Sequence, residues 1–394
     1  MKPIYFDNNA TTPVAPEVFE EMLPYLREFY GNPSSMHTFG GQLHRKVEEA
    51  RAKVALLIGA DPEEIIFASC GTESDNTAIM SAVESFPQKR HVITTRVEHP
   101  AVLNFCKHLA RKGYRVTFLP VNNQGQLNID ELLKVLDDDT VMVSVMYANN
   151  EVGNIYPIAE IGEILREKRI LFHTDAVQAV GKIPINLKEL PVDMLSLSGH
   201  KLHAPKGIGA LYVRKGTRFF PYIIGGHQER GRRAGTENVA SIIALGKACE
   251  LAAQTMTEEV TYLQRLRDKL ESALLQSCPD VRVNGDVTSR LPNTTNISFE
   301  YVEGEAILLR LNEYGVCASS GSACTSGSLE PSHVLRSMGV PFTTIHGSIR
   351  FSLSRYNTEA EIDKVIEIMP DIIKNLRQLS PFGREKPGQI TKCP

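Results

Sequence analysis

The chain has 394 residues, of which 42% are hydrophobic and 23% charged, an ordinary composition for a globular protein. One hydrophobic core seldom serves that length, so two domains are expected. The net charge of −3, with both signs interspersed, gives no reason to expect nucleic acid or an anionic membrane as a partner, and no apolar run approaches the roughly 20 residues that span a bilayer.

The cysteines argue against disulfides and against a structural metal. There are seven, an odd number, and they are scattered without any Cys-x-x-Cys pair. The first residues also lack the apolar core of a secretion signal. These features predict a cytoplasmic protein without a resident metal ion.

The first third of the chain contains one candidate anion site. Apolar spacing predicts a helix over 43–58, and a strand is expected over 64–68. Gly71 and Thr72 follow, at the point where this strand leads into another helix. Free N–H groups and the helix dipole favour a phosphate there, although threonine and serine also cap helices whatever the function.

From residue 92 onward, strands and helices alternate. Strands are expected at 92–95, 116–121, 141–147 and 170–172, and helices up to Lys112 and at 129–135 and 158–168. Such repeated units imply a largely parallel sheet with helices on both faces. The sequence therefore predicts an α/β fold.

Four polar residues come directly after strands of this predicted sheet: His99, Asn150, Asp175 and Lys201. Ligands of open α/β sheets bind at the carboxyl ends of the strands, so these side chains are expected to converge. Taken alone, His99 would first be interpreted as a structural histidine.

Lys201 and Asp175 give the clearest chemical signal. Lys201 lies in a polar turn between the apolar runs 194–197 and 210–213, and Asp175 ends the run that begins at Ile170. A lone lysine in a turn is usually solvated. A lysine that forms a Schiff base, together with a carboxylate against the pyridinium nitrogen, is however the minimal apparatus of a pyridoxal phosphate enzyme.

The second half of the chain predicts a bridging helix and a smaller unit. The basic, glycine-rich loop 225–238 is either a solvated loop or an anion site that acts across a subunit boundary. A helical region from about 239 to 278, broken once, is long enough to bridge two domains. Strands at 295–299 and 347–354, helices at 306–311 and 359–376 and a loose tail after residue 381 complete the chain. We expect a large domain at 14–257, with 1–13 and 258–394 forming the small domain.

Residues 319–328 contain almost nothing that could anchor a backbone, so a mobile loop is predicted there. Cys324 within it is unusual, because free cysteines are mostly buried. A thiol on an exposed mobile loop is the arrangement of a reactive cysteine. Cys317, next to apolar Val316, is instead expected to be a packing residue at a strand end.

Nine short runs, spread over nearly the whole chain, match one family of enzymes. They are Phe6–Thr12, Gly31–Ser35, Glu98–Val102, Ala148–Glu151, His173–Gln178, Ser198–Lys201, Arg233–Asn238, Ser319–Cys324 and Arg350–Ser354. In these runs the chain resembles the cysteine desulfurases of the class V aminotransferase family, and most closely their nitrogen-fixation (NifS-like) branch. The resemblance implies fold type I of the pyridoxal phosphate-dependent transferases, with a large, mostly parallel-sheet domain and a smaller α+β domain.

The resemblance also implies roles for individual residues around pyridoxal 5'-phosphate. Lys201 would form the Schiff base and move the substrate α-proton, and His99 would stack on the ring and assist proton transfer as a further catalytic residue. Asp175 would pair with the ring nitrogen and Gln178 would contact the phenolic oxygen. The phosphate would be held by Gly71, Thr72, Ser198, Gly199 and His200, together with Thr236 of the partner subunit.

For the substrate, the resemblance implies that Asn150 and Arg350 hold the carboxylate, with Asn32 nearby; Asn150 also counts among the cofactor contacts. Cys324 would be the nucleophile that takes sulfur from L-cysteine, leaving L-alanine and an enzyme persulfide. The implied protein is a homodimer that passes sulfur to an iron–sulfur scaffold protein of the NifU/IscU type, where Cys324 would be a transient cluster ligand. Whether the role is dedicated to nitrogenase stays open.

Three other interpretations compete with this one. An aminotransferase would use the same lysine and aspartate without requiring Cys324. A selenocysteine lyase is closer, and an assay of sulfide against selenide release separates it. A metal-binding scaffold is disfavoured because only Cys317 and Cys324 lie close together in the sequence.

Overall fold

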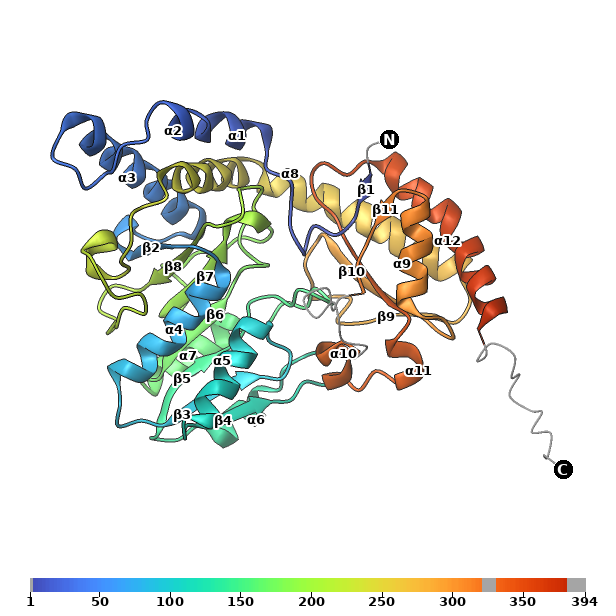
Figure 1. The fold of residues 1–394 in the computed structure, drawn as a ribbon. Coiled ribbons are helices and arrows are strands. Elements are labelled where there is room, and N and C mark those ends of the chain that lie inside the picture. Colours follow the sequence, from blue (N-terminus) through green and yellow to red (C-terminus); the bar gives the residue numbers. More distant parts are fainter. Residues whose placement is uncertain (1–2, 321–330, 381–394) are drawn as a thin grey trace.

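The computed structural model describes residues 3–320 and 331–380. Its largest element is a seven-stranded sheet (Figure 1). In spatial order the strands are β2 (Ile65–Ala68), β8 (Gly209–Val213), β7 (Met194–Ser198), β6 (Leu171–Asp175), β5 (Thr140–Ser144), β3 (His91–Thr95) and β4 (Arg115–Leu119). Only β8 runs antiparallel to its neighbours. The predicted strands are confirmed, with ends that differ by up to three residues.

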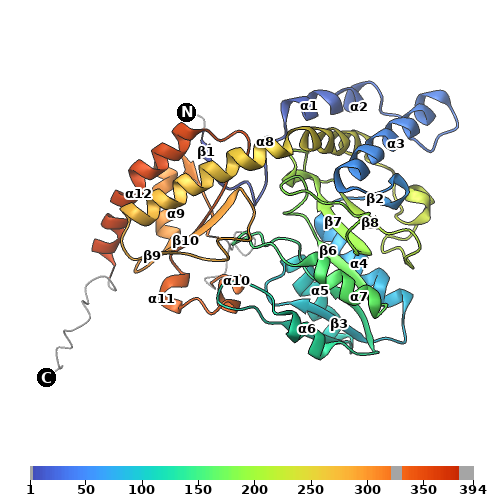
Figure 2. The same cartoon turned by 180° about the vertical axis from the view of Figure 1, so that it is seen from behind.

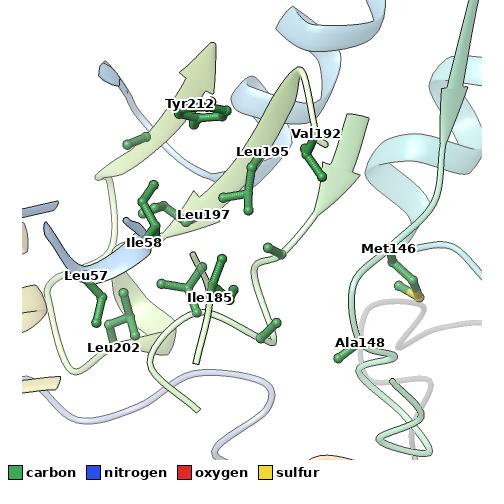
Figure 3. Packing of buried hydrophobic residues seen from close by; sticks show 14 of the residues in the cluster. Leu57, Ile58, Met146, Ala148, Ile185, Val192, Leu195, Leu197, Leu202 and Tyr212 are labelled. Atoms are coloured by element: carbon green, nitrogen blue, oxygen red, sulfur yellow. The ribbon is translucent and has the colours of Figure 1, made fainter. Parts of the chain in front are cut away.

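Helices cover both faces of this sheet, because successive strand residues point to opposite sides. In β7, Leu195 and Leu197 belong to one core, together with residues of α3 (Thr38–Ile58) and α7 (Ile158–Glu167). Met194 belongs to the opposite core, with residues of α4 (Gly71–Ser85) and α5 (Pro100–Arg111). Figure 3 shows part of the first core, with Leu197 beside Ile58 and with Met146 and Ala148 on the segment that follows β5. The expected α/β fold is confirmed.

A smaller unit is built on a three-stranded antiparallel sheet with the order β12 (Ser348–Ser352), β10 (Thr294–Phe299) and β9 (Val281–Val283). The helices α9 (Gly304–Glu313) and α12 (Glu359–Leu379) pack on it and share a separate hydrophobic core. The chain start contributes β1 (Ile4–Tyr5), which pairs in parallel with β11 (Val316–Cys317). Cys317 is therefore a strand end, as predicted.

One helix, α8 (Val239–Ser277), runs past both units (Figures 1 and 2). Its core residues between Val239 and Ala252 belong to the large core, and those from Leu263 to Leu274 to the smaller one. The predicted break is wrong. The segment contains no proline, and at its one glycine, Gly246, a Cβ atom would come within 2.7 Å of Ala50 Cα, so that residue marks a close helix contact rather than a bend.

The predicted domain boundary at 257/258 falls inside α8, so we keep this division of the chain as a proposal. Sequence patterns also missed several short helices: α1 (Pro16–Met22), α2 (Pro24–Arg27), α10 (His333–Ser337) and α11 (Phe342–Ile345). The predicted short helix α6 (Ile129–Val135) is confirmed. The predicted loose tail lies outside the described residues, and within 3–320 and 331–380 no helix is long and apolar enough to cross a membrane.

A buried ion pair fixes the basic, glycine-rich loop to the large sheet. Arg51 in α3 donates from both terminal nitrogens to Glu229, at 2.6 and 2.8 Å, and each side chain is only 4% exposed. Glu229 also accepts from the backbone N–H of Phe67 in β2, at 2.9 Å. Arg230 follows Glu229, and both have left-handed backbone conformations, with φ of 59° and 49°. The pair therefore holds a strained turn in place.

Replacing Arg51 by methionine should lower the free energy of unfolding by about 3–5 kcal/mol, because the Glu229 carboxylate would stay buried without its partner. Urea denaturation measures this loss. Arg45→Met is the matched control, since the Arg45–Glu49 pair in the same helix is 80% and 47% exposed, and it should change stability by under about 1 kcal/mol. Equal effects of the two substitutions would contradict a stabilising role of the buried pair.

Candidate active site

A cavity of about 180 Å³ lies at the carboxyl edge of the large sheet. Ten of the residues predicted from sequence line it: Gly71, Thr72, His99, Asn150, Asp175, Gln178, Ser198, His200, Lys201 and Arg350. The expected convergence of His99, Asn150, Asp175 and Lys201 is confirmed. They meet because β3, β5, β6 and β7 are parallel, so the segments that follow them leave at one edge of the sheet.

Lys201 is held by the N-terminal segment of the chain. It ends a short 3-10 turn, η2 (Gly199–Lys201), directly after β7. Its Nζ donates to the backbone oxygens of Asn9, at 2.5 Å, and Ala10, at 2.7 Å. Asn9 is itself fixed by a hydrogen bond from its Nδ2 to Thr294 Oγ1, at 2.8 Å. Two backbone carbonyl oxygens of the N-terminal segment thus position the amine.

Two buried carboxyl groups face the cavity. Asp175, the last residue of β6, accepts from the N–H of Val177 at 2.9 Å, and burial raises its pKa to about 6. Asp75 lies in α4, and its pKa is raised by burial and by the charge of Asp175. Because Asp75 and Asp175 line the same cavity, ionisation of one carboxyl group disfavours ionisation of the other. A cationic group bound against Asp175 would favour its ionised form.

His99 is a neutral ring with a defined tautomer. It caps α5, and its Nδ1 accepts from the N–H of Ala101 at 3.1 Å, so the ring proton lies on Nε2. Burial, followed by the charges of Lys201 and His333, lowers the pKa of His99 to about 4. At neutral pH the ring can therefore stack on an apolar group and donate one N–H.

The start of α4 forms an anion cradle. The helix begins at Gly71, and its N-cap residue, Cys70, makes no side-chain cap hydrogen bond, so the first N–H groups stay available. A Cβ atom at position 71 would come within 2.7 Å of Val177 Cγ2, which explains the glycine. The buried Ser198 Oγ has no hydrogen-bond partner among the described residues. These donors fit a phosphate group.

Arg350 connects the cavity to the smaller sheet. It lies in β12 and is 2% exposed. Its guanidinium donates to Asp7 Oδ1 at 2.6 Å and to the backbone oxygen of Asn150 at 2.9 Å. A planar guanidinium at this point can bind a carboxylate, provided that the contact with Asp7 is exchanged.

Four predicted site residues do not line the cavity. Asn32 is exposed, and its Oδ1 accepts from the N–H of Ser34. Thr236 is exposed in the loop before α8. Gly199 is buried between Ser198 and His200, where a Cβ atom would come within 2.8 Å of Ile208. Cys324 and its predicted mobile loop lie outside the described residues, apart from Ser319 and Ser320.

Sequence patterns missed several residues of the cavity wall: Asn9, Ala10, Cys70, Asp75, Met146, Ala148 and Val177. Asn9 and Ala10 stand within the run Phe6–Thr12, which the resemblance had already marked without assigning a role. Asp75 lies four residues after Gly71, one helical turn from the anion cradle, and this spacing could have placed it at the same site.

Within the described part of the chain, no group of three or more histidine, cysteine or acidic residues is arranged to hold a metal ion. The described cysteines, Cys70, Cys106, Cys249, Cys278 and Cys317, are free. The groups that the cavity offers are an amine, two carboxyl groups, a neutral imidazole and hydrogen-bond donors for an anion.

Comparison with known proteins identifies the family. The family model described as aminotransferase class-V matches residues 4–365. A protein of Trichormus azollae named cysteine desulfurase is 64% identical over 390 residues, 99% of this chain and 98% of its own. Cysteine desulfurase NifS of Azotobacter vinelandii is 58% identical, with coverage of 97% and 95%.

Solved structures agree with the sequence comparison. One titled NifS-like protein aligns with a TM-score of 0.90 at 42% identity, covering 95% of this chain and 100% of its own. A NifS-like protein from Rickettsia africae aligns with a TM-score of 0.85 at 34% identity, with coverage of 94% and 99%. The resemblance drawn from short runs is confirmed: the chain belongs to the class-V aminotransferase family and, within it, to the NifS-like cysteine desulfurases.

Proposed function

We propose that this protein is a pyridoxal 5'-phosphate-dependent cysteine desulfurase, which converts L-cysteine to L-alanine and transfers the sulfur to Cys324 as a persulfide. The observation that carries the proposal is the joint presence of Lys201, Asp175 and the anion cradle around one cavity. The names of the similar proteins support the same reaction.

The residues present fit the cofactor. Lys201 would bind it covalently, and Asp175 would face its ring nitrogen. The anion cradle at Gly71, Thr72 and Ser198, with Gly199 and His200, would hold its phosphate. When bound, the cofactor supplies an electron sink for the substrate α-carbon.

The remaining groups bind substrate and move protons. Arg350 and Asn150 would hold the α-carboxylate, with Asn32 approaching from its exposed loop. Lys201, held by the Asn9 and Ala10 carbonyls at 2.5 and 2.7 Å, would accept the α-proton as a base. His99, which is neutral with its proton on Nε2, would donate a hydrogen bond on the other side of the reacting carbons.

Sulfur transfer needs a thiolate in addition to these groups. The Cys324 thiolate would attack the substrate sulfur, so that an S–S bond forms and the Cβ–S bond breaks. The bonding electrons stay with Cβ, which takes up a proton to complete alanine. The product on the enzyme is a persulfide at Cys324.

We further propose a homodimer. Large apolar side chains are exposed on α1, α2 and the segment leading into α3, among them Phe19, Leu26, Tyr30 and Met36, of which Met36 is fully exposed. Thr236 is exposed on the loop before α8. In a dimer, Thr236 of the partner subunit would reach the phosphate bound to this chain. A mass in solution twice that of one chain is the direct check.

The destination of the sulfur follows from the same reaction. The persulfide at Cys324 would pass sulfur to an iron–sulfur scaffold of the NifU/IscU type, in a role connected with nitrogen fixation, with Cys324 as a transient cluster ligand. Five free cysteines among the described residues fit a reducing cytoplasm.

Cys324→Ala tests the nucleophile. The variant should bind pyridoxal phosphate and L-cysteine but release no alanine at a catalytic rate, and intact mass spectrometry should find no persulfide, because the attacking thiolate is missing. Cys317→Ala is the matched control. It should still release alanine and carry the persulfide, since Cys317 ends strand β11. Alanine release at the wild-type rate from Cys324→Ala would place the nucleophile elsewhere.

Asp175→Asn tests the electron sink. Without a negative charge beside the ring nitrogen, exchange of the substrate α-proton with solvent deuterium should slow by about 100- to 1,000-fold, while the cofactor stays bound. Proton NMR follows this exchange. Asp193→Asn serves as control, because Asp193 accepts a backbone N–H at the opposite end of β6. Unchanged exchange in Asp175→Asn would remove Asp175 from its proposed role.

A further inference from the structure

A second lysine lies behind the active-site cavity. Lys182 lies in the loop between β6 and β7, and with Lys201, Glu259 and Arg355 it lines a small cavity of about 20 Å³ on the far side of Lys201. Its Nζ donates to Gln178 Oε1 at 2.7 Å. None of the steps described above uses Lys182. Its hydrogen-bond partner, Gln178, nevertheless lines the active-site cavity.

The contact determines how the Gln178 amide is oriented. The amino group of Lys182 is the donor in its contact, so Oε1 of Gln178 faces Lys182. On the other side, Gln178 Nε2 donates to the backbone oxygen of Asn9, at 2.9 Å, and a carbonyl only accepts. A flipped amide would lose the hydrogen bond to Asn9, because two oxygens would then face each other, and it would also lose the contact with Lys182 whenever that amine is charged. Gln178 lines the active-site cavity, so its second N–H is the group that it can offer there.

Gln178 is also linked to Lys201. The Asn9 oxygen that accepts from Gln178 accepts from Lys201 Nζ as well, at 2.5 Å. Lys182, Gln178, Asn9 and Lys201 thus form one continuous hydrogen-bonded chain from the small cavity to the active site. Any change in the Gln178 amide therefore acts on a carbonyl that positions Lys201.

We propose that Lys182 is a positioning residue for Gln178: it holds the amide oxygen away from the active-site cavity, so that Gln178 donates and does not accept a hydrogen bond at a cofactor oxygen. The proposal rests on the proposed function, because it assigns the oriented N–H to an anionic or phenolic oxygen of pyridoxal phosphate. It concerns a residue that otherwise has no role in the reaction.

The surroundings of Lys182 fit a hydrogen-bonding role. The nearby charged groups are Lys201, Arg350 and the ion pair of Glu259 with Arg355, whose atoms are 2.9 Å apart. Desolvation, followed by the charges of Lys201 and Arg350, lowers the pKa of Lys182 to about 7. Charged and neutral amines both donate N–H, so the contact with Gln178 persists on either side of this pH.

A double-mutant cycle tests the proposal with Lys182→Met, Gln178→Ala and the double variant, in the full-length holoenzyme. The dissociation constant of pyridoxal phosphate and the pH midpoint of the absorbance change of the bound cofactor are measured for each, after thermal unfolding has shown that each variant folds. Lys188→Met is the matched control, because that side chain is 68% exposed. If Lys182→Met does not fold, Lys182→Ala replaces it.

Lys182→Met should weaken cofactor binding by about tenfold, the effect of one lost hydrogen bond. In the Gln178→Ala background it should add less than about twofold, because its partner is already gone. Both single variants should shift the absorbance midpoint in the same direction. Lys182→Gln, which keeps an N–H donor without a charge, should stay within about threefold of the wild type, and Lys188→Met should match the wild type.

Three results would overturn the proposal: equal effects of Lys182→Met with and without Gln178, an unchanged absorbance midpoint, or a loss in Lys182→Gln as large as that in Lys182→Met. Each of them leaves the proposed function standing. Failure of the wild-type protein to bind pyridoxal phosphate would instead remove the proposed function itself.

Discussion

The active site depends on the position of the N-terminal segment. Residues 6–15 lie between the two sheets and bond to both. Asn8 Nδ2 donates to the backbone of Ser352 in the small sheet, while the N–H groups of Thr12 and Ala15 donate to the oxygens of His200 and His203 beside Lys201. Carbonyls from this segment then hold the Lys201 amine. These two carbonyl oxygens are neutral acceptors, so they fix the position of the amine without adding a negative charge of their own.

The second constraint is the burial of charge at one sheet edge. Asp175, Asp75 and His99 are all drawn toward their neutral forms, chiefly by burial. This is costly for folding, and it is the condition in which a bound cation or anion has the strongest effect. Parallel strands concentrate these groups, and α4 adds its dipole at the same edge. In the proposed function, these charges would become balanced when a ligand with both a cationic ring and a phosphate binds.

Local patterns predicted the elements that this edge requires. The strands β3, β5, β6 and β7, and the polar residues that follow them, could be found because apolar runs and turn residues are read within a few positions. The position of Lys201 and Asp175 followed from the same reasoning. By contrast, the Lys201–Asn9 contact spans 192 residues of sequence, and no periodicity encodes such a contact.

Other features of the site depend on packing that a single sequence does not show. Two ion pairs join segments that are distant in the sequence: Arg350 with Asp7, and Arg51 with Glu229. The close approach of α8 to α3, at Gly246 and Ala50, is likewise a contact between distant segments. Lys182 has no motif of its own near a strand end, and its contact with Gln178 appears only when the loop after β6 is folded. These are tertiary effects that override or add to local propensity.

In the proposed active site, Lys201 is the residue that binds pyridoxal phosphate. Borohydride reduction of the purified holoenzyme fixes the bond between cofactor and protein, and digestion followed by mass spectrometry locates it. The structure predicts a single label on Lys201. A label on Lys182, which lies behind the cavity, would contradict the assignment of the active site. So would a label on Lys206, which lies five residues after Lys201.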